Sequence, residues 1–263
     1  MESRIVGILN VTPDSFSDGG EHFSTDMALA HAEKMAAEGA DIIDVGGETS
    51  RPGSEPVSEE EELRRVIPVI ERLTAEKFSL PISIDTYKPK VAEEALAAGA
   101  SILNDITGLT NPGMRAVAGH AKAPVILMHM QGAPKTMQEN PTYTDVIADI
   151  KEFFETQIAL AKKDGITDII LDPGIGFGKT LEHNLLIIKR LREFTDLGFP
   201  ILVGPSRKAF IGTLTGGAPV SDRLEGTLAA AVMARMNGAS YFRVHDVKAC
   251  RRALQIADAT ASA

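Results

Sequence analysis

The sequence predicts an α/β protein, a (βα)8 TIM barrel with its active site at the C-terminal ends of the strands. Short apolar, β-branched segments alternate with longer amphipathic segments along all 263 residues, and polar residues gather where the apolar segments end. Apolar strands that alternate with helices are typical of a parallel sheet covered by helices. No linker, low-complexity segment or change of composition divides the chain, so we expect one domain, residues 1–263.

Eight segments have the strand pattern, and eight strand–helix units of about 30 residues close naturally into a barrel. An open doubly wound sheet, which usually has fewer strands, is the alternative. The expected strands are Ile5–Val11, Asp41–Gly47, Pro81–Thr86, Ser101–Ile106, Pro124–Met130, Asp168–Gly174, Pro200–Ser206 and Tyr241–Val247. The clearest helical patterns are Met27–Ala40, Glu60–Glu76 and Val146–Gly165. A glycine follows each of five helical patterns, as expected at helix C-termini: Gly39, Gly99, Gly165, Gly198 and Gly238.

Composition narrows the class of protein. The net charge is −9 and no run of Lys or Arg occurs, so we expect no nucleic-acid partner. No apolar stretch approaches the ~18 residues that span a bilayer, and the N-terminal segment does not have the pattern of a secretory signal. The one cysteine, Cys250, lies in an apolar helical pattern and is expected to be a buried, inert thiol. These features predict a cytoplasmic protein without membrane contact.

Polar residues occupy the C-terminal end of every expected strand. In a barrel these ends form one rim, where active sites are built. Residues scattered over unrelated loops are the alternative. The residues concerned are Asn10, Asp44, Asp85, Asn104, Asp105, His129, Asp172, Ser206, Arg243 and His245.

Two carboxylates and an amide on this rim suit a flat heterocycle. Asp85 and Asp172 each end a strand that leaves little room for water, so each must be paired or hydrogen-bonded. A 2-amino-4-oxo heterocycle presents adjacent N–H donors that a carboxylate can accept, and Asn104 can both donate and accept. The alternatives are that Asp172 caps the following helix and that Asp85 pairs with Lys88.

Cationic residues converge on the last two strands. Ser206, Arg207 and Lys208 follow the seventh strand, and Arg243 and His245 lie on one face of the eighth because strand side chains alternate. Loops at this position form the commonest phosphate site of the barrel. We expect an anion subsite that Asn10 completes, with salt bridges to nearby acids as the alternative for each cation.

Two loops and one glycine-rich stretch complete the expected site. The segments Asn10–Gly20 and Glu48–Ser58 are rich in short polar residues and glycine, as in a lid, although ordinary surface loops are the alternative. The stretch Asp172–Thr180 is not a phosphate loop, because Pro173 occupies the place of the first glycine. We interpret it as a flexible wall with Phe177 available for stacking. No histidine or cysteine spacing indicates a tight metal site. If a diphosphate binds, Mg2+ would arrive largely with that ligand and need only one or two ligands from the protein.

Seven segments in this order identify a resemblance over nearly the whole chain: LNVTPDSFSDGG, GGETSRPG, SIDTYK, LNDITG, LDPGIGFGK, GPSRK and RVHDV. The sequence is similar to bacterial dihydropteroate synthases. That resemblance implies a TIM barrel that condenses p-aminobenzoate with (7,8-dihydropterin-6-yl)methyl diphosphate, giving 7,8-dihydropteroate and diphosphate by SN1-like loss of diphosphate. It also implies Mg2+ as cofactor, a homodimer and sensitivity to sulfonamides.

The resemblance assigns roles to particular positions. Asp85, Asn104, Asp172, Lys208 and Met128 correspond to the pterin pocket. Asn10, Arg243 and His245 correspond to the diphosphate site, with Asn10 as the contact for Mg2+. Ser50, Arg51, Pro52 and Phe177 correspond to the p-aminobenzoate side, and Asp18 to the closing first loop. Asp85, Asp172, Lys208 and Asp18 are the expected catalytic residues. Many family members have threonine where this sequence has Ser50, which bears on affinity for aminobenzoate and sulfonamides.

Two other functions are compatible with a pterin pocket. A methyltetrahydrofolate–corrinoid methyltransferase shares the barrel and the pterin acids but handles no diphosphate. A pterin-binding module without turnover is the second alternative. The SRK, RVH and DSFSDGG segments favour the synthase, because they supply the expected anion site and its lid.

Overall fold

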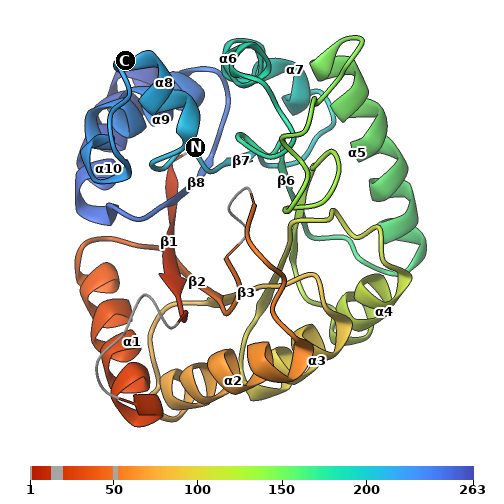
Figure 1. Ribbon diagram of the computed structural model, residues 1–263, viewed down its shortest axis with the longest axis vertical. Helices are drawn as coiled ribbons and strands as arrows, with labels where there is room; N and C mark the ends of the chain where they lie inside the picture. Colours follow the sequence, from red (N-terminus) through yellow and green to blue (C-terminus); the bar gives the residue numbers. More distant parts are fainter. Residues whose placement is uncertain (1, 13–19, 50–52) are drawn as a thin grey trace.

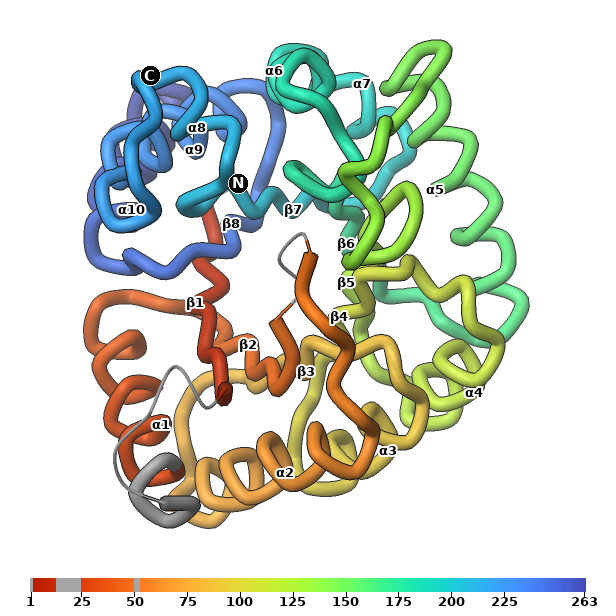
Figure 2. The backbone as a smooth tube through the Cα atoms, viewed as in Figure 1, coloured from red at the N-terminus to blue at the C-terminus, as the bar shows by residue number. Residues whose placement is uncertain are grey.

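A ring of parallel strands surrounded by helices forms the core of the protein (Figure 1). The computed structural model describes residues 2–12, 20–49 and 53–263, apart from the side chains of residues 20–24. The chain runs once around the ring, so that neighbouring colours in the trace are neighbouring elements and the last helix lies beside the first strand (Figure 2).

Eight strands pair in parallel in the order β6-β5-β4-β3-β2-β1-β8-β7. A bridge between Leu171 and Ile201 connects the two ends of this sheet and closes the barrel. The strands are β1 (Arg4–Asn10), β2 (Ile42–Gly46), β3 (Ile82–Asp85), β4 (Ile102–Asp105), β5 (Val125–Met128), β6 (Ile169–Asp172), β7 (Leu202–Val203) and β8 (Tyr241–Val244).

The strands alternate with helices that cover the outside of the barrel (Figure 1). The helices are α1 (Gly20–Ala37), α2 (Glu59–Ala75), α3 (Pro89–Ala98), α4 (Pro112–Ala121), α5 (Val146–Lys163), α6 (Leu181–Lys189), α7 (Arg192–Thr195), α8 (Ala209–Leu214), the 3-10 helix η2 (Val220–Asp222), α9 (Leu224–Met236) and α10 (Val247–Ser262).

Helix α2 illustrates how local sequence and packing agree. Ser58 caps its N-terminus by accepting from the Glu61 amide, and four glutamates occupy the first turn, where the helix dipole favours negative charge. Val66, Val69 and Ile70 are buried against the barrel. This apolar layer between helices and strands is the main core, and Cys250 lies in it, where burial raises the pKa of its thiol to about 12.

The barrel interior has an apolar base below a polar mouth. Side chains that point inward from six strands form a small cluster at the base: Val6, Ile42, Ile102, Ile126, Ile170 and Leu202. Because strand side chains alternate, the residue two positions further along each strand also points inward, nearer the mouth. On β4, β6 and β8 these next inward residues are Asn104, Asp172 and Arg243. The alternation of side chains along each strand therefore places these polar residues close together in the mouth of the barrel.

The eight expected strands and the barrel are confirmed. The seventh strand is shorter than expected, because Pro205 has no N–H for a ladder and Gly204 lacks a side chain to pack. The five expected C-terminal glycines all have positive φ and each follows a helix. Within the part of the chain that the structure describes, no helix is long and apolar enough to cross a membrane.

Candidate active site

One cavity of about 710 Å³ opens at the C-terminal ends of the strands. All nine described residues that the sequence predicted for the site line it: Asn10, Asp85, Asn104, Met128, Asp172, Phe177, Lys208, Arg243 and His245. The other four, Asp18, Ser50, Arg51 and Pro52, lie outside the described residues. The strand ends and the loops after them therefore bring these nine together. Three residues expected on the same rim, Asp44, Asp105 and His129, are buried and do not line the cavity.

Glycines at two inward positions leave room for the cavity. Gly46 pairs with Asn10 on one side and Asp85 on the other. A Cβ atom there would lie 3.5–3.8 Å from the Asp85 side chain. Across the barrel, a Cβ on Gly204 would lie 3.8 Å from the Cβ of Arg243. Larger residues at these positions would fill the space between the polar groups of the mouth.

Arg243 connects two carboxylates in the mouth. Its Nε donates to Asp44 Oδ2 and its Nη2 donates to Asp85 Oδ2, both at 2.6 Å. Asn104 Nδ2 also donates to Asp44 Oδ2, at 3.0 Å. Burial opposes the charge of Arg243, but Asp44 and Asp85 outweigh it and raise its pKa. The salt bridge considered for this arginine therefore forms, with one cation shared by two acids.

Both predicted carboxylates have raised pKa values. Burial raises the pKa of Asp85 to about 7 against the opposing charge of Arg243, and neighbouring acids add to the shift. Burial raises the pKa of Asp172 to about 6, although the Gly174 amide and nearby cations stabilise its charge. Carboxylates with pKa values near neutrality in a cavity are typical of functional sites.

The two structural alternatives for these acids do not occur. Thr180, and not Asp172, caps helix α6, and Asp172 instead accepts from the Gly174 amide at 2.7 Å. Lys88 pairs with Glu48 and Glu62 rather than with Asp85. Both predicted carboxylates thus face the cavity rather than serving a helix cap or a surface ion pair.

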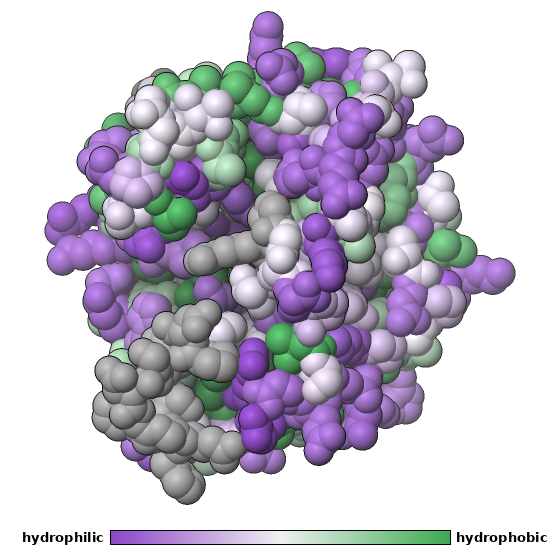
Figure 3. Space-filling view, viewed as in Figure 1, coloured by the Kyte–Doolittle hydropathy of each residue, from purple (hydrophilic) through white to green (hydrophobic). Residues whose placement is uncertain are grey.

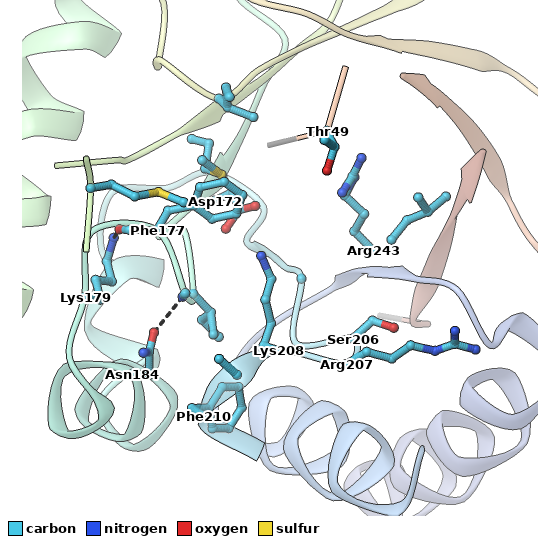
Figure 4. A pocket seen from close by; sticks show the side chains of 18 of the residues that line it. Thr49, Asp172, Phe177, Lys179, Asn184, Ser206, Arg207, Lys208, Phe210 and Arg243 are labelled. Carbon is cyan, nitrogen blue, oxygen red and sulfur yellow. Dashed lines mark hydrogen bonds between the residues drawn. The ribbon is translucent and has the colours of Figure 1, made fainter. Parts of the chain in front are cut away.

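The glycine-rich segment after β6 forms one wall. The Lys208 ammonium lies 3.9 Å from the centroid of the Phe177 ring, and Figure 4 shows its side chain extending toward Asp172 and Phe177. Gly174, with φ of +69°, passes so close to the β5 loop that a Cβ would lie 2.0 Å from the His129 carbonyl oxygen. The wall is therefore closely packed at its base, in contrast to the flexible wall expected from its glycines.

The cationic residues at and after the ends of β7 and β8 form what we call the cationic corner. Two pairs of interacting side chains support it. Ser206 Oγ lies 2.9 Å from His245 Nδ1 and also accepts from the His245 amide at 3.2 Å, which fixes the imidazole relative to the loop after β7. Arg207 makes a two-point salt bridge with Asp246 through Nε at 3.0 Å and Nη2 at 2.7 Å. Of the cations in the SRK segment, Lys208 is thus the one directed to the aromatic wall.

Sequence reasoning assigned no role to several residues that line the cavity or lie directly beneath it. Asp44 was placed on the rim, but its link to Arg243 joins residues 199 positions apart and could not be read from spacing. Glu48 accepts from Tyr87 and Lys88. Lys179 drew attention only as part of a failed phosphate-loop pattern, yet it is 2% exposed and lines the cavity.

The model of the family described as pterin binding enzyme matches residues 6–245. Dihydropteroate synthase from Escherichia coli K12 is 53% identical over 262 residues, which cover 99% of this chain and 92% of that relative. The structure of the Yersinia pestis dihydropteroate synthase with a sulfonamide drug is similar with a TM-score of 0.94 and 48% identity, and covers 100% of this chain and 95% of that one.

The chain belongs to the dihydropteroate synthase family of pterin-binding enzymes. Two structures of the Xanthomonas albilineans family member contain ligands of the reaction. One, with 4-aminobenzoic acid, has a TM-score of 0.93 at 45% identity and covers 100% of this chain and 94% of that one. The other, with 7,8-dihydropteroate, has a TM-score of 0.89 at 44% identity, with 100% and 95% covered. The expected family and the transferase class are confirmed, and the corrinoid methyltransferase is not favoured.

Proposed function

We propose that this chain condenses p-aminobenzoate with (7,8-dihydropterin-6-yl)methyl diphosphate at the mouth of its barrel, releasing 7,8-dihydropteroate and diphosphate. The observation that carries the proposal is the single cavity lined by all nine described residues expected for this reaction. Structures of family members with 4-aminobenzoic acid and with 7,8-dihydropteroate support the choice of substrates.

The pterin half of the substrate is assigned to the carboxylate side of the cavity. Asp85 and Asp172 accept N–H groups of the ring, Asn104 complements its edge, and Met128 contacts its face. As the bond to diphosphate breaks in an SN1-like step, positive charge spreads over the pterin, and two carboxylates beside it stabilise that charge. Lys208 positions the ring between the two substrate sites.

The departing diphosphate is assigned to the cationic corner. Arg243 and His245 donate to its oxygens, and charge-assisted hydrogen bonds of this kind are strong in a cavity that excludes water. Arg243 must then exchange part of its contact with Asp44 and Asp85 for the new anion. That exchange frees Asp85 to accept from the pterin when both halves of the substrate are present.

The donor set of the mouth suits Mg2+ that arrives with the diphosphate. Asn10 ends β1 at the cavity and offers an amide oxygen, a hard ligand of the kind Mg2+ prefers. No group of three or more His, Cys, Asp or Glu side chains that could hold a metal occurs among the described residues. Asn10 would supply a protein ligand, and bound Mg2+ would neutralise charge on the diphosphate.

The second substrate, p-aminobenzoate, is assigned to the side of the cavity next to Phe177 and Lys208. Ser50, Arg51 and Pro52 are proposed to complete this side, and Asp18 belongs to the proposed closing loop. The aniline nitrogen attacks the pterin methylene after diphosphate has left. No Ser, Cys or Lys nucleophile is required, and the cysteine of the chain, Cys250, is buried.

We also propose that the protein is a cytoplasmic homodimer. Large apolar side chains are exposed on the neighbouring C-terminal helices, and Figure 3 shows apolar surface over α8. Examples are Leu214 at 54%, Met233 at 55% and Ile256 at 71% exposure. Light scattering during size-exclusion chromatography at micromolar concentration tests the dimer: a mass near twice 28.1 kDa is expected, and a mass of one chain contradicts it.

A turnover assay tests the proposed reaction. The purified protein is incubated with pterin diphosphate, Mg2+ and p-aminobenzoate, and diphosphate and dihydropteroate are quantified, with and without a sulfonamide competitor. We expect equal amounts of the two products and inhibition by the sulfonamide. Binding of the pterin diphosphate without product would identify a binding module, and methyl transfer from methyltetrahydrofolate to a corrinoid would identify the rival enzyme.

A further inference from the structure

Lys179 is a cavity lysine for which the proposed reaction has no role. It lies in the segment between β6 and α6, and it is 2% exposed. Its Nζ donates to the carbonyl oxygens of Phe177 at 2.9 Å and His129 at 3.3 Å, and lies 3.0 Å from His129 Nδ1. An ammonium group has three donors, and each has an acceptor here.

The imidazole of His129 is suited to accept from this ammonium. Burial, aided by the charge of Lys179, lowers the pKa of His129 to about 2, so the ring is neutral. A neutral ring that carries its proton on Nε2 presents a lone pair at Nδ1. Burial also lowers the pKa of Lys179 itself, to about 7, while Asp172 favours its charge.

Within the described residues Lys179 forms no salt bridge, and the carboxylate that favours its charge, Asp172, does so without an ion pair. A buried cation without such a partner carries a desolvation cost of several kcal/mol, which an apolar side chain of similar length would avoid. The contacts show what the ammonium does instead: it connects the loop after β5, through His129, to the loop after β6, through Phe177.

The contacts of Lys179 involve Phe177, the aromatic residue of the cavity wall. Phe177 is only 7% exposed, its ring faces Lys208 at 3.9 Å, and its backbone carbonyl is one of the two that Lys179 binds. Figure 4 shows Lys179 on the opposite side of Phe177 from Lys208. Phe177 thus contacts Lys179 through its backbone carbonyl and Lys208 through the face of its ring.

We propose that Lys179 is a positioning residue that holds Phe177 against the aryl-amine side of the cavity and thereby sets affinity for the second substrate. The inference rests on the proposed function, which assigns p-aminobenzoate to this wall. Within the described residues, the hydrogen bonds of Lys179 go to Phe177 and His129, and its link to the pterin carboxylate Asp172 is electrostatic only. We therefore expect its removal to act mainly on p-aminobenzoate.

Steady-state kinetics of Lys179→Met, Lys179→Arg and the exposed control Lys163→Met test the proposal. In Lys179→Met we expect the KM for p-aminobenzoate to rise about tenfold while the KM for pterin diphosphate stays within about twofold. In Lys179→Arg, which keeps the charge, the KM for p-aminobenzoate should rise only about threefold. Lys163→Met, at the exposed end of α5, should match the wild type.

Equal changes in both KM values, or no change in either, would overturn the proposal, because a merely structural role does not separate the two substrates. If Lys179→Met does not fold, Lys179→Arg decides alone: a threefold selective rise supports the proposal, and equal ratios contradict it. Failure of the wild type to form product would instead overturn the proposed function, so the two failures are distinguishable.

Discussion

Arg243 Nη2 lies 2.6 Å from Asp85 Oδ2, so the cation assigned to the diphosphate is ion-paired with a carboxylate assigned to the pterin. The same guanidinium also binds Asp44, which is fully buried. One positive charge thus stabilises two buried acids until the substrate brings its own charges. The pairing links the stability of the barrel mouth to its function.

Replacing Arg243 with methionine should destabilise the protein strongly. Two buried carboxylates would lose their shared cation, and breaking a buried pair from one side costs about 3–5 kcal/mol. Urea unfolding at pH 8 measures this loss, with Arg252→Met on the exposed face of α10 as control. The loss should shrink at pH 5, where Asp85, whose pKa is raised to about 7, takes up a proton. A variant as stable as the control at pH 8 would show that Arg243 is dispensable for the fold.

Asp172→Asn should be more stable than the wild type but inactive. The pKa of Asp172 in the folded state, about 6, exceeds its unfolded value, so its charged form destabilises the fold increasingly as pH rises from about 4 to 6. Removing that charge should add roughly 1–3 kcal/mol to the free energy of unfolding at pH 8. Turnover should fall at least about 100-fold, because a group that stabilises the pterin cation is lost.

Asp168→Asn is the matched control for this variant, because Asp168 directly precedes the same strand at the opposite end of the barrel. It should change neither activity nor stability by more than about 0.5 kcal/mol. If Asp172→Asn retains turnover comparable to this control, the assignment of Asp172 to the pterin is wrong.

The rate constant kcat/KM for pterin diphosphate should fall as the pH drops from about 8 to 5. Asp85, with a pKa of about 7, and Asp172, with a pKa of about 6, must be ionised to accept N–H groups and to stabilise positive charge. Because both pKa values are raised, the active forms are lost well above the usual carboxylate range. A profile that stays flat down to pH 5 would contradict the role of these acids.

Gly174→Ala should destabilise the protein far more than Gly198→Ala. Both glycines have positive φ, +69° and +79°, so both variants carry the strain of about 1–2 kcal/mol of that conformation. Only at Gly174 would the new Cβ lie 2.0 Å from a backbone oxygen, that of His129, whereas nothing lies within 4 Å at Gly198. Thermal unfolding should show at least about 3 kcal/mol of additional loss for Gly174→Ala. Equal losses would mean that the two loops are not packed as described.

The barrel could be predicted from sequence because its determinants are local. Strand periodicity, helix-ending glycines and polar strand endings each occupy a few consecutive residues, and the repetition of the strand pattern eight times leaves little choice of architecture. The length of β7 was less predictable, because Pro200–Ser206 has a strand pattern and the strand is shortened by the missing N–H of Pro205 and the missing side chain of Gly204.

The site was predictable only in part, for a physical reason. Strand endings place Asp85, Asp172 and Arg243 on one rim, but partners are chosen by side-chain reach across the barrel. The link from Arg243 to Asp44 and the contact of Lys179 with His129 follow from that reach and leave no mark in residue spacing.

Single-turnover release of diphosphate most directly tests the proposal that the carboxylates bind the pterin while Arg243 and His245 bind the diphosphate. Enzyme in excess over pterin diphosphate and Mg2+ is mixed rapidly, with and without p-aminobenzoate, and diphosphate is followed over time. If carboxylates stabilise the pterin cation while Arg243 and His245 hold the leaving group, diphosphate is released without p-aminobenzoate and at a rate independent of its concentration. Release that requires p-aminobenzoate, with a rate proportional to its concentration, would contradict the account.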